Sequence, residues 1–362
     1  MRKLLLAIMV IAVAMPAFAS ETRLRTLGPG VAPFIEDDAN VFTWYATLPS
    51  YEDLVTVTVG YWDVYYEMED WEGYDEGGED LAARFGLTYG LGDDAEYGVL
   101  GLWWEEETPG PNRWMGMDGL WAGPSFGPYT DFSRFIYNKW HAMYGYAMDG
   151  MSFGLYFNRA DQGSYEEQSG VDGDYENYSS YTTIGAGVRF DIGDDAYADL
   201  AFDWTTVGYT YTQLGSDEEV EADANMILGF RGRMFYEWTD VITWVPYVSY
   251  RMGDLSLQST EETFYADDDC WGIKGFQFDL GLAANMMVND ETMIIVAVEP
   301  FGYYKAEPSD CGPDADTGEI KMTMLPAFAF GFENDVKEWL TLRLGCDKAF
   351  VKFEESYEAE GE

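Results

Sequence analysis

Beyond its first twenty residues the sequence lacks any apolar run long enough for a transmembrane helix; the longest uninterrupted one is MIIVAV, at 293–298. A helix needs about 20 consecutive apolar residues to cross a bilayer. Membrane-spanning strands are not excluded, because their lipid-facing and lumen-facing residues alternate and their hydropathy averages out. The mean hydropathy of −0.24 is therefore compatible with a water-soluble protein and with a membrane barrel.

Basic residues are scarce: 20 Lys and Arg stand against 66 Asp and Glu, and the formal net charge is −46. Loss of two basic residues with a cleaved signal leaves 18, and the charge becomes −48. A chain this acidic repels nucleic acid and anionic membrane surfaces. Disorder is disfavoured as well, because 17% of the residues are aromatic and 47% are hydrophobic.

The sequence also lacks the usual signs of an enzyme. His141, the single histidine, stands beside Lys139 with no serine or cysteine pattern nearby that would supply a nucleophile. There is no metal-ligand spacing around it and no glycine-rich phosphate loop in the chain. We therefore predict a protein that is not an enzyme, with no catalytic residues and no cofactor.

What the sequence does have begins with a secretory signal. Two basic residues at 2–3 precede an apolar stretch at 4–15 and a small-x-small cleavage site at 17–19. The alternative, a membrane anchor helix, would need a longer apolar core. We interpret residues 1–19 as a signal peptide and residues 20–53 as a lead-in segment.

Alternation with a period of two predicts strands along most of the remaining chain. In 333–350, for example, Leu340, Leu342 and Leu344 alternate with residues that include Arg343. No helix is predicted after the signal. The thirteen predicted strands are 54–62, 81–91, 97–106, 131–147, 150–160, 178–192, 196–212, 221–237, 241–256, 272–288, 292–305, 318–332 and 336–353.

The connections between these strands alternate in length. Short connections with tight-turn sequences, such as MDG (148–150) and GDD (193–195), alternate along the chain with long acidic connections, such as 161–177 and 259–270. With the signal, the up-and-down strands and the aromatic strand ends, the chain resembles bacterial outer-membrane β-barrel proteins of the porin-like kind. This resemblance implies an all-β, transmembrane, up-and-down antiparallel barrel of about 13–14 strands over 54–353, with short periplasmic turns and long extracellular loops.

The charged face of each strand is predicted to line the lumen, since an Arg or Lys at the bilayer midplane costs roughly 2–4 kcal/mol. These residues would form either a constriction that sorts solutes by charge or a salt-bridged interior that stabilises the barrel. The set comprises Arg84, Arg189, Asp191, Asp199, Asp203, Arg231, Arg233, Arg251, Asp279, Glu299, Lys321, Arg343 and Asp347.

Two loop features add candidate sites. Cys270 and Cys311 lie in consecutive long loops and are predicted to form a disulfide, against the alternative of two free thiols. A loosely calcium-like spacing of oxygen ligands is formed by Asp310, Asp314, Asp316 and Glu319. A solvated acidic loop explains this second pattern better, although crowded acidic loops would attract divalent cations such as calcium.

The predicted function is an outer-membrane channel for small hydrophilic solutes that prefers cations or saccharides. The alternative is a plugged structural or surface-interaction barrel that presents its acidic loops; a barrel enzyme is a third and weaker reading. Outer-membrane lipid and lipopolysaccharide are the expected surroundings. The oligomeric state is open.

An odd strand count raises a question about closure, since single-chain bacterial barrels nearly always use an even number. We interpret the acidic tail, 354–362, as the start of a further extracellular loop. A chain truncated after this point is the favoured explanation of the odd strand count. The two alternative explanations are a parallel seam between the first and last strands and an additional strand from 29–47.

Overall fold

The structure is a computed structural model that describes most of the chain between residues 30 and 357. The predicted signal and the central parts of the six long connections lie outside the described residues. The described residues are 23, 26–27, 30–62, 80–106, 108–109, 135–136, 138–166, 175–213, 219–259, 270–308, 318–337 and 340–357.

One antiparallel sheet of 13 strands makes up the fold, and each strand pairs with the next one along the chain. β4 (Thr108–Pro109) and β5 (Phe135–Ile136) form a separate two-stranded sheet, so the main sheet passes from β3 directly to β6. The strands of the main sheet are β1 (Val55–Trp62), β2 (Asp80–Gly90), β3 (Val99–Glu106), β6 (Asn138–Met148), β7 (Met151–Glu166), β8 (Tyr175–Asp191), β9 (Ala196–Gln213), β10 (Glu219–Thr239), β11 (Ile242–Ser259), β12 (Cys270–Asn289), β13 (Thr292–Pro308), β14 (Gly318–Lys337) and β15 (Leu340–Tyr357).

The all-β, up-and-down antiparallel fold class is thereby confirmed, with one observed strand for each predicted one. No helix within the described residues is long and apolar enough to cross a membrane. Short turns join every second strand pair, and glycines with positive φ form two of them: Gly150 (68°) between β6 and β7, and Gly193 (78°) between β8 and β9. Glycine suits these positions because it adopts a left-handed backbone without steric cost.

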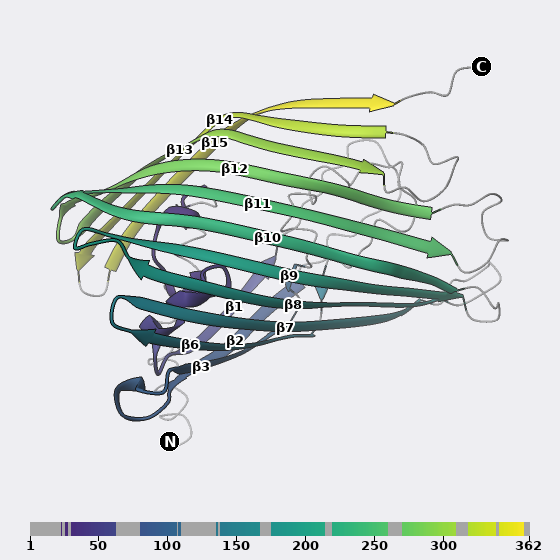
Figure 1. Cartoon of the computed structure of the whole chain (residues 1–362), viewed down its shortest axis with the longest axis horizontal. Helices are drawn as coiled ribbons and strands as arrows, with labels where there is room; N and C mark the ends of the chain where they lie inside the picture. The colour runs from purple at the N-terminus through teal and green to yellow at the C-terminus, as the bar shows by residue number, and fades with distance from the viewer. Residues whose placement is uncertain are drawn as a thin grey trace.

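Residues 30–51, which we call the inner segment, lie inside the curve of the sheet (Figure 1). They form three short 3-10 helices, η1 (Ala32–Phe34), η2 (Asp38–Phe42) and η3 (Tyr45–Tyr51). A fourth, η4 (Asp93–Ala95), lies in the β2–β3 turn. The expectation of no helix was therefore wrong at these places, and so was the idea of an additional strand from 29–47.

β1 and β15 stand at the two ends of the strand order, and no ladder joins them within the described residues. β15 also continues to Tyr357, past residue 353 where the barrel was predicted to end. The first four strands of the main sheet are short, whereas β7 to β15 reach well beyond the inner segment (Figure 1).

Candidate functional site

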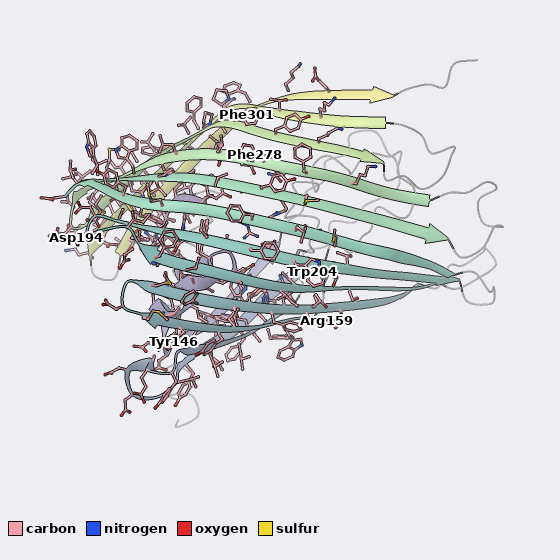
Figure 2. All side chains as sticks on the ribbon, in the orientation of Figure 1. Tyr146, Arg159, Asp194, Trp204, Phe278 and Phe301 are labelled. Atoms are coloured by element: carbon pink, nitrogen blue, oxygen red, sulfur yellow. The ribbon has the colours of Figure 1, made fainter. Side chains whose placement is uncertain are left out.

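The outer face of the sheet is apolar and exposed. Trp204, Phe278 and Phe301 are among the side chains on this face (Figure 2). Large apolar side chains that are exposed on the strands include Phe85, Leu87, Leu100, Leu102, Phe153, Leu155, Phe157, Ile184, Phe202, Trp204, Phe230, Leu280, Leu282, Val296, Phe301, Phe328, Leu340, Leu342 and Leu344. An apolar surface that continues over a whole sheet is far larger than the patches that water-soluble monomers expose.

On β7 this apolar surface ends at a defined level. On β7 the outward positions from the turn are Phe153, Leu155 and Phe157, and the next one is Arg159. On this strand the band starts at Met151 beside the turn and ends before Arg159, so it is about eight residues tall, close to the 9–11 residues that a tilted strand needs to cross a bilayer.

The inner face has the opposite character. Its buried residues include charged side chains such as Glu105, with 0% exposure, and Asp199, with 1%, whereas Leu155 on the outer face is 58% exposed. Buried charges are stable only when they are paired and hydrogen-bonded. The interior of this protein must therefore contain organised polar networks.

The inner segment packs directly on the strands. Glycines in the strand walls make room for it and for the residues just before it: a Cβ atom on Gly154 would lie 2.0 Å from the Tyr45 carbonyl oxygen, and one on Gly345 would lie 2.1 Å from that of Leu27. Two buried clusters join its apolar side chains to the wall. One includes Phe34 and the other includes Trp44.

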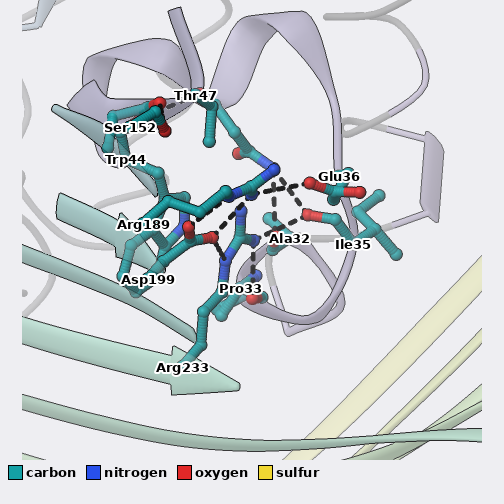
Figure 3. A network of polar contacts seen from close by, with 12 residues as sticks. Ala32, Pro33, Ile35, Glu36, Trp44, Thr47, Ser152, Arg189, Asp199 and Arg233 are labelled. Atoms are coloured by element: carbon teal, nitrogen blue, oxygen red, sulfur yellow. Dashed lines mark hydrogen bonds and ion pairs between the residues drawn. The ribbon is translucent and has the colours of Figure 1, made fainter. Parts of the chain in front are cut away.

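A network around Arg233 holds the inner segment to the wall (Figure 3). The Arg233 Nε atom donates to Asp199 Oδ2 at 2.9 Å, and its Nη1 atom donates to the carbonyl oxygens of Ile35 at 2.7 Å and Pro33 at 3.1 Å. The guanidinium also lies 4.3 Å from the ring centroid of Trp44, within the range of a cation–π contact. One wall arginine thus satisfies two carbonyl groups of the inner segment.

Arg189 completes this network from β8, which pairs with β9, the strand that carries Asp199. Its guanidinium pairs with both carboxylate oxygens of Asp199, at 2.6 and 2.8 Å, and with Glu36 at 2.6 Å. Asp199 is therefore shared between two arginines, and Glu36 of the inner segment supplies a second carboxylate. Such charge-assisted, two-point contacts are among the strongest hydrogen bonds in proteins.

Additional hydrogen bonds from the wall reach the backbone of the inner segment. Ser152 Oγ donates to the Ala46 carbonyl at 2.7 Å, and Asn285 Nδ2 donates to the Phe34 carbonyl at 2.7 Å. At the far edge, Glu333 accepts from Arg343 at 2.6 Å and from Arg23 at 2.9 Å. The wall therefore contacts the N-terminal region at points far apart around the sheet.

A second network lies between the wall strands β3, β6 and β2. Glu105 pairs with Arg84, with Lys139 at 3.3 Å and with His141 at 3.3 Å. The other ring nitrogen of His141 lies 2.8 Å from the Tyr156 hydroxyl. Phe42 of the inner segment covers this group, with its ring centroid 4.9 Å from that of His141.

Two tyrosines of the inner segment add no charge to this interior. Burial raises the pKa of the Tyr45 hydroxyl, which is hydrogen-bonded to Arg231. Burial also raises the pKa of Tyr51, and the nearby carboxylates of Glu36 and Asp37 raise it further. Both phenols stay neutral at ordinary pH because their usual pKa is already near 10.

Most of the residues that were predicted to line the lumen lie on the inner face, and several of them belong to the two networks described above. Arg231 pairs with Asp203, and Asp279 accepts from Ser249 at 3.0 Å. Asp347 approaches the inner segment, since a Cβ on Gly30 would lie 3.4 Å from its own Cβ. Asp191, Arg251 and Glu299 also lie on the inner face, because they alternate along their strands with the exposed apolar residues.

Lys321 is the exception, and its expected place in the lumen was wrong. The β-sheet register pairs it with Lys305, which lies on the outer face. The reason is a pair of irregularities, at residues 299–300 in β13 and 326–327 in β14, that exchange the two faces along these strands. Each contains a proline, Pro300 or Pro326, which cannot donate a ladder hydrogen bond.

Four of the six residues in the two predicted loop sites lie outside the described part of the chain. Cys311, Asp310, Asp314 and Asp316 lie outside the described residues, so the disulfide with Cys270 and the calcium loop with Glu319 stay predictions. Within the described part of the chain there is no group of three or more metal-ligating side chains.

Sequence reasoning missed the inner segment and the Glu105 network. The dense apolar residues of 27–48 and the inward-facing strand glycines were available signals for the inner segment. The partners of Glu105 depend on the β3–β6 register, which pairs Glu105 with Lys139 across the long connection between these strands.

Fold and interior together define an all-β, up-and-down barrel with an apolar outside and a charged, filled inside. No protein-family model matches the chain, and a search of curated proteins found no significant match. Among solved structures, it is similar to the alcaligin outer membrane receptor FauA from Bordetella pertussis, with 9% identity and a TM-score of 0.42. The match covers 76% of this chain and 49% of the receptor, so the chain spans about half of that receptor's length.

Proposed function

We propose that this protein is an outer-membrane barrel whose interior is closed by its own N-terminal region. Two features support the membrane location: the continuous apolar outer face and the charged inner face. This is the reverse of a water-soluble protein, and it matches what a bilayer requires of a spanning barrel. The long acidic loops then lie outside the cell and the short turns lie in the periplasm.

The contacts of the inner segment carry the proposal that the barrel is plugged. η3 contacts β3 and β6 to β9, and η1 contacts β11 and β12. Arg233 on β10 donates to the backbone of the inner segment, and Leu27 lies against β14 and β15. The Tyr51 carbonyl accepts from Thr88 on β2. A segment that contacts the wall from β2 to β15 obstructs free diffusion of solutes.

The proposed role is therefore that of a plugged structural or surface-interaction barrel that presents acidic loops. These loops carry a large negative charge and would attract cations at the cell surface. The porin-like channel is the second candidate, favoured by the half-buried Arg251, Asp279 and Glu299 on the inner face. In that case the inner segment must move before small cations or saccharides can pass.

Conductance in planar bilayers separates the two roles. We expect the wild-type chain to insert without a steady conductance, and the variant Arg233→Met, which loses the hydrogen bonds to Pro33 and Ile35, to show intermittent openings. Arg159→Gln is the matched control, because Arg159 lies on the outer face and pairs with Asp161. A steady, wild-type conductance equal to that of Arg233→Met would overturn the plugged barrel and leave the porin-like channel.

Location and orientation are tested separately. Protease added to intact cells should cut within 161–177 and 259–270 and leave the turn at 193–195 intact. Cleavage at the turn alone would reverse the proposed orientation.

A further inference from the structure

The outer face carries a groove near the ends of β10 to β13 that point to the long loops. Its volume is about 320 Å³. Leu228, Met252 and Phe276 form its apolar part, and the side chains of Lys274 and Lys305 contribute to the same groove. Pockets of 300–1,000 Å³ that combine apolar walls with a few polar groups are typical of ligand sites.

The groove lies at the border of the apolar band. On β13 the outward positions run from Phe301 to Tyr303 and then to Lys305, so apolar, aromatic and charged residues follow one another. Phe276 lies beside this series, with its ring centroid 5.6 Å from that of Tyr303. In a membrane this sequence of residue types is found at the interface, where headgroups begin. The apolar part of the groove then faces acyl chains, and its lysines lie at headgroup level.

The charge at this level is unusual for so acidic a chain. Lys305 and Lys321 are direct cross-strand partners, and like charges in that position destabilise a sheet. Acidic residues occupy neighbouring register positions, since Asp254 and Glu307 are the partners of Lys274 and Glu354 is the partner of Lys321 on β15. Each lysine ammonium has three donors, so it can contact a carboxylate and a further anion together. Three ammonium groups at one level can therefore bind a phosphate in addition to the contacts that they already make.

We propose that this groove binds one membrane lipid that carries a phosphate. The phosphate lies against Lys274 and Lys305, with Lys321 beside them, and an acyl chain lies over Leu228, Met252 and Phe276. This inference rests on the proposed membrane location. It adds a specific lipid site to a surface that otherwise meets lipid without selection.

Native mass spectrometry of the full chain in a neutral detergent tests the site with dioleoylphosphatidic acid as the probe. Dioleoylglycerol has the same acyl chains without phosphate, and inorganic phosphate has no chains. We expect phosphatidic acid to bind at least tenfold more tightly than either. The variant Lys274→Gln/Lys305→Gln should raise its Kd at least tenfold, and Met252→Ala/Phe276→Ala should also weaken binding.

The matched control is Lys337→Gln/Lys348→Gln, which removes the same charge from exposed lysines away from the groove. It should change the Kd less than twofold. Equal losses in both lysine pairs would overturn the site, as would equal binding of dioleoylglycerol. Inorganic phosphate that competes at the same concentration as phosphatidic acid would show a free-anion site, which also contradicts the proposal.

Folding of each variant is checked by the heat-dependent shift of the barrel on gels. If the double lysine variant does not fold, Lys305→Gln alone serves, because it removes one member of a like-charged pair; it should still raise the Kd, and an unchanged Kd would contradict the site. Insertion into dioleoylphosphatidylcholine vesicles separates the two proposals. A chain that inserts but does not prefer phosphatidic acid overturns only the groove, whereas a chain that does not insert overturns the membrane location.

Discussion

The two charge networks of the inner face differ in what they join. The Arg233 network connects the wall to the inner segment, because its donors end on the Pro33 and Ile35 carbonyls. The Glu105 network connects wall strands to one another, and Phe42 only covers it. Both bury charge, yet only the first depends on the inner segment for its hydrogen bonds. We therefore expect one network to control closure of the barrel and the other to stabilise its wall.

The largest effect is expected from Glu105→Gln. This change removes the carboxylate shared by Arg84, Lys139 and His141 and leaves cationic groups close together in a buried place. Loss of one partner in a buried charge network costs about 3–5 kcal/mol, and a shared acid belongs at the upper end. Urea unfolding of the barrel in detergent measures the loss. The bilayer conductance should stay at the wild-type level, and an open variant would contradict the division between the two networks.

Arg233→Met should have the next largest effect on stability. Unlike Glu105→Gln, it should increase the bilayer conductance. Arg189 still neutralises Asp199, so the loss of stability should lie near the lower end of about 3–5 kcal/mol. The carbonyls of Pro33 and Ile35 lose their donor, however, and the inner segment is released more often. Unfolding and conductance measured on the same preparation give both quantities. A variant that is destabilised yet fully closed would show that this network is structural like the other.

Gly154→Ala tests how closely the inner segment packs. The added Cβ would lie 2.0 Å from the Tyr45 carbonyl oxygen, and backbone on both sides cannot give way easily. Overpacking of this kind costs about 1–3 kcal/mol, and it should also loosen the inner segment. Gly331→Ala is the control, because its Cβ would meet Leu27 and Val31 at an ordinary 3.4 Å. Equal unfolding midpoints for the two variants would argue against a tightly seated segment.

The strands of the wall, and most of the charged residues that face the interior, were predictable from the sequence, whereas the partners of those residues and the path of the inner segment were not. Alternation with a period of two depends only on neighbours in the chain, so Leu340, Leu342 and Leu344 could be assigned to one face and Arg343 to the other. The network of Asp199, by contrast, depends on which strands are adjacent and on where the inner segment runs.

Lys321 shows the limit of the same rule. Regular alternation through Pro326 would place Lys321 in the interior, but the irregularity there moves every residue of β14 before it to the opposite face. A proline within a predicted strand is itself a signal for such a site. The inner segment gave no periodic signal, because its 3-10 helices of three to seven residues are too short to show one.

A smaller effect on the inner segment is expected from Asn285→Ala. Its amide donates to the Phe34 carbonyl at 2.7 Å, and one neutral hydrogen bond contributes about 1 kcal/mol. The unfolding midpoint should fall slightly, and combination with Arg233→Met should raise the frequency of channel openings further. Openings no more frequent in the double variant than in Arg233→Met alone would mean that Asn285 does not help to hold the segment.

The smallest effect is expected from Lys352→Gln, on the outer face and outside both networks. Lys352 pairs with Glu354, but the two side chains are 58% and 52% exposed, so water and salt screen their attraction. Exposed pairs of this kind contribute about 0–1 kcal/mol. We expect an unfolding midpoint within error of the wild type and an unchanged conductance. A loss as large as that of Asn285→Ala would mean that the outer rim stabilises the barrel as much as a contact of the inner segment does, and the contrast between interior and exterior charge would have to be abandoned.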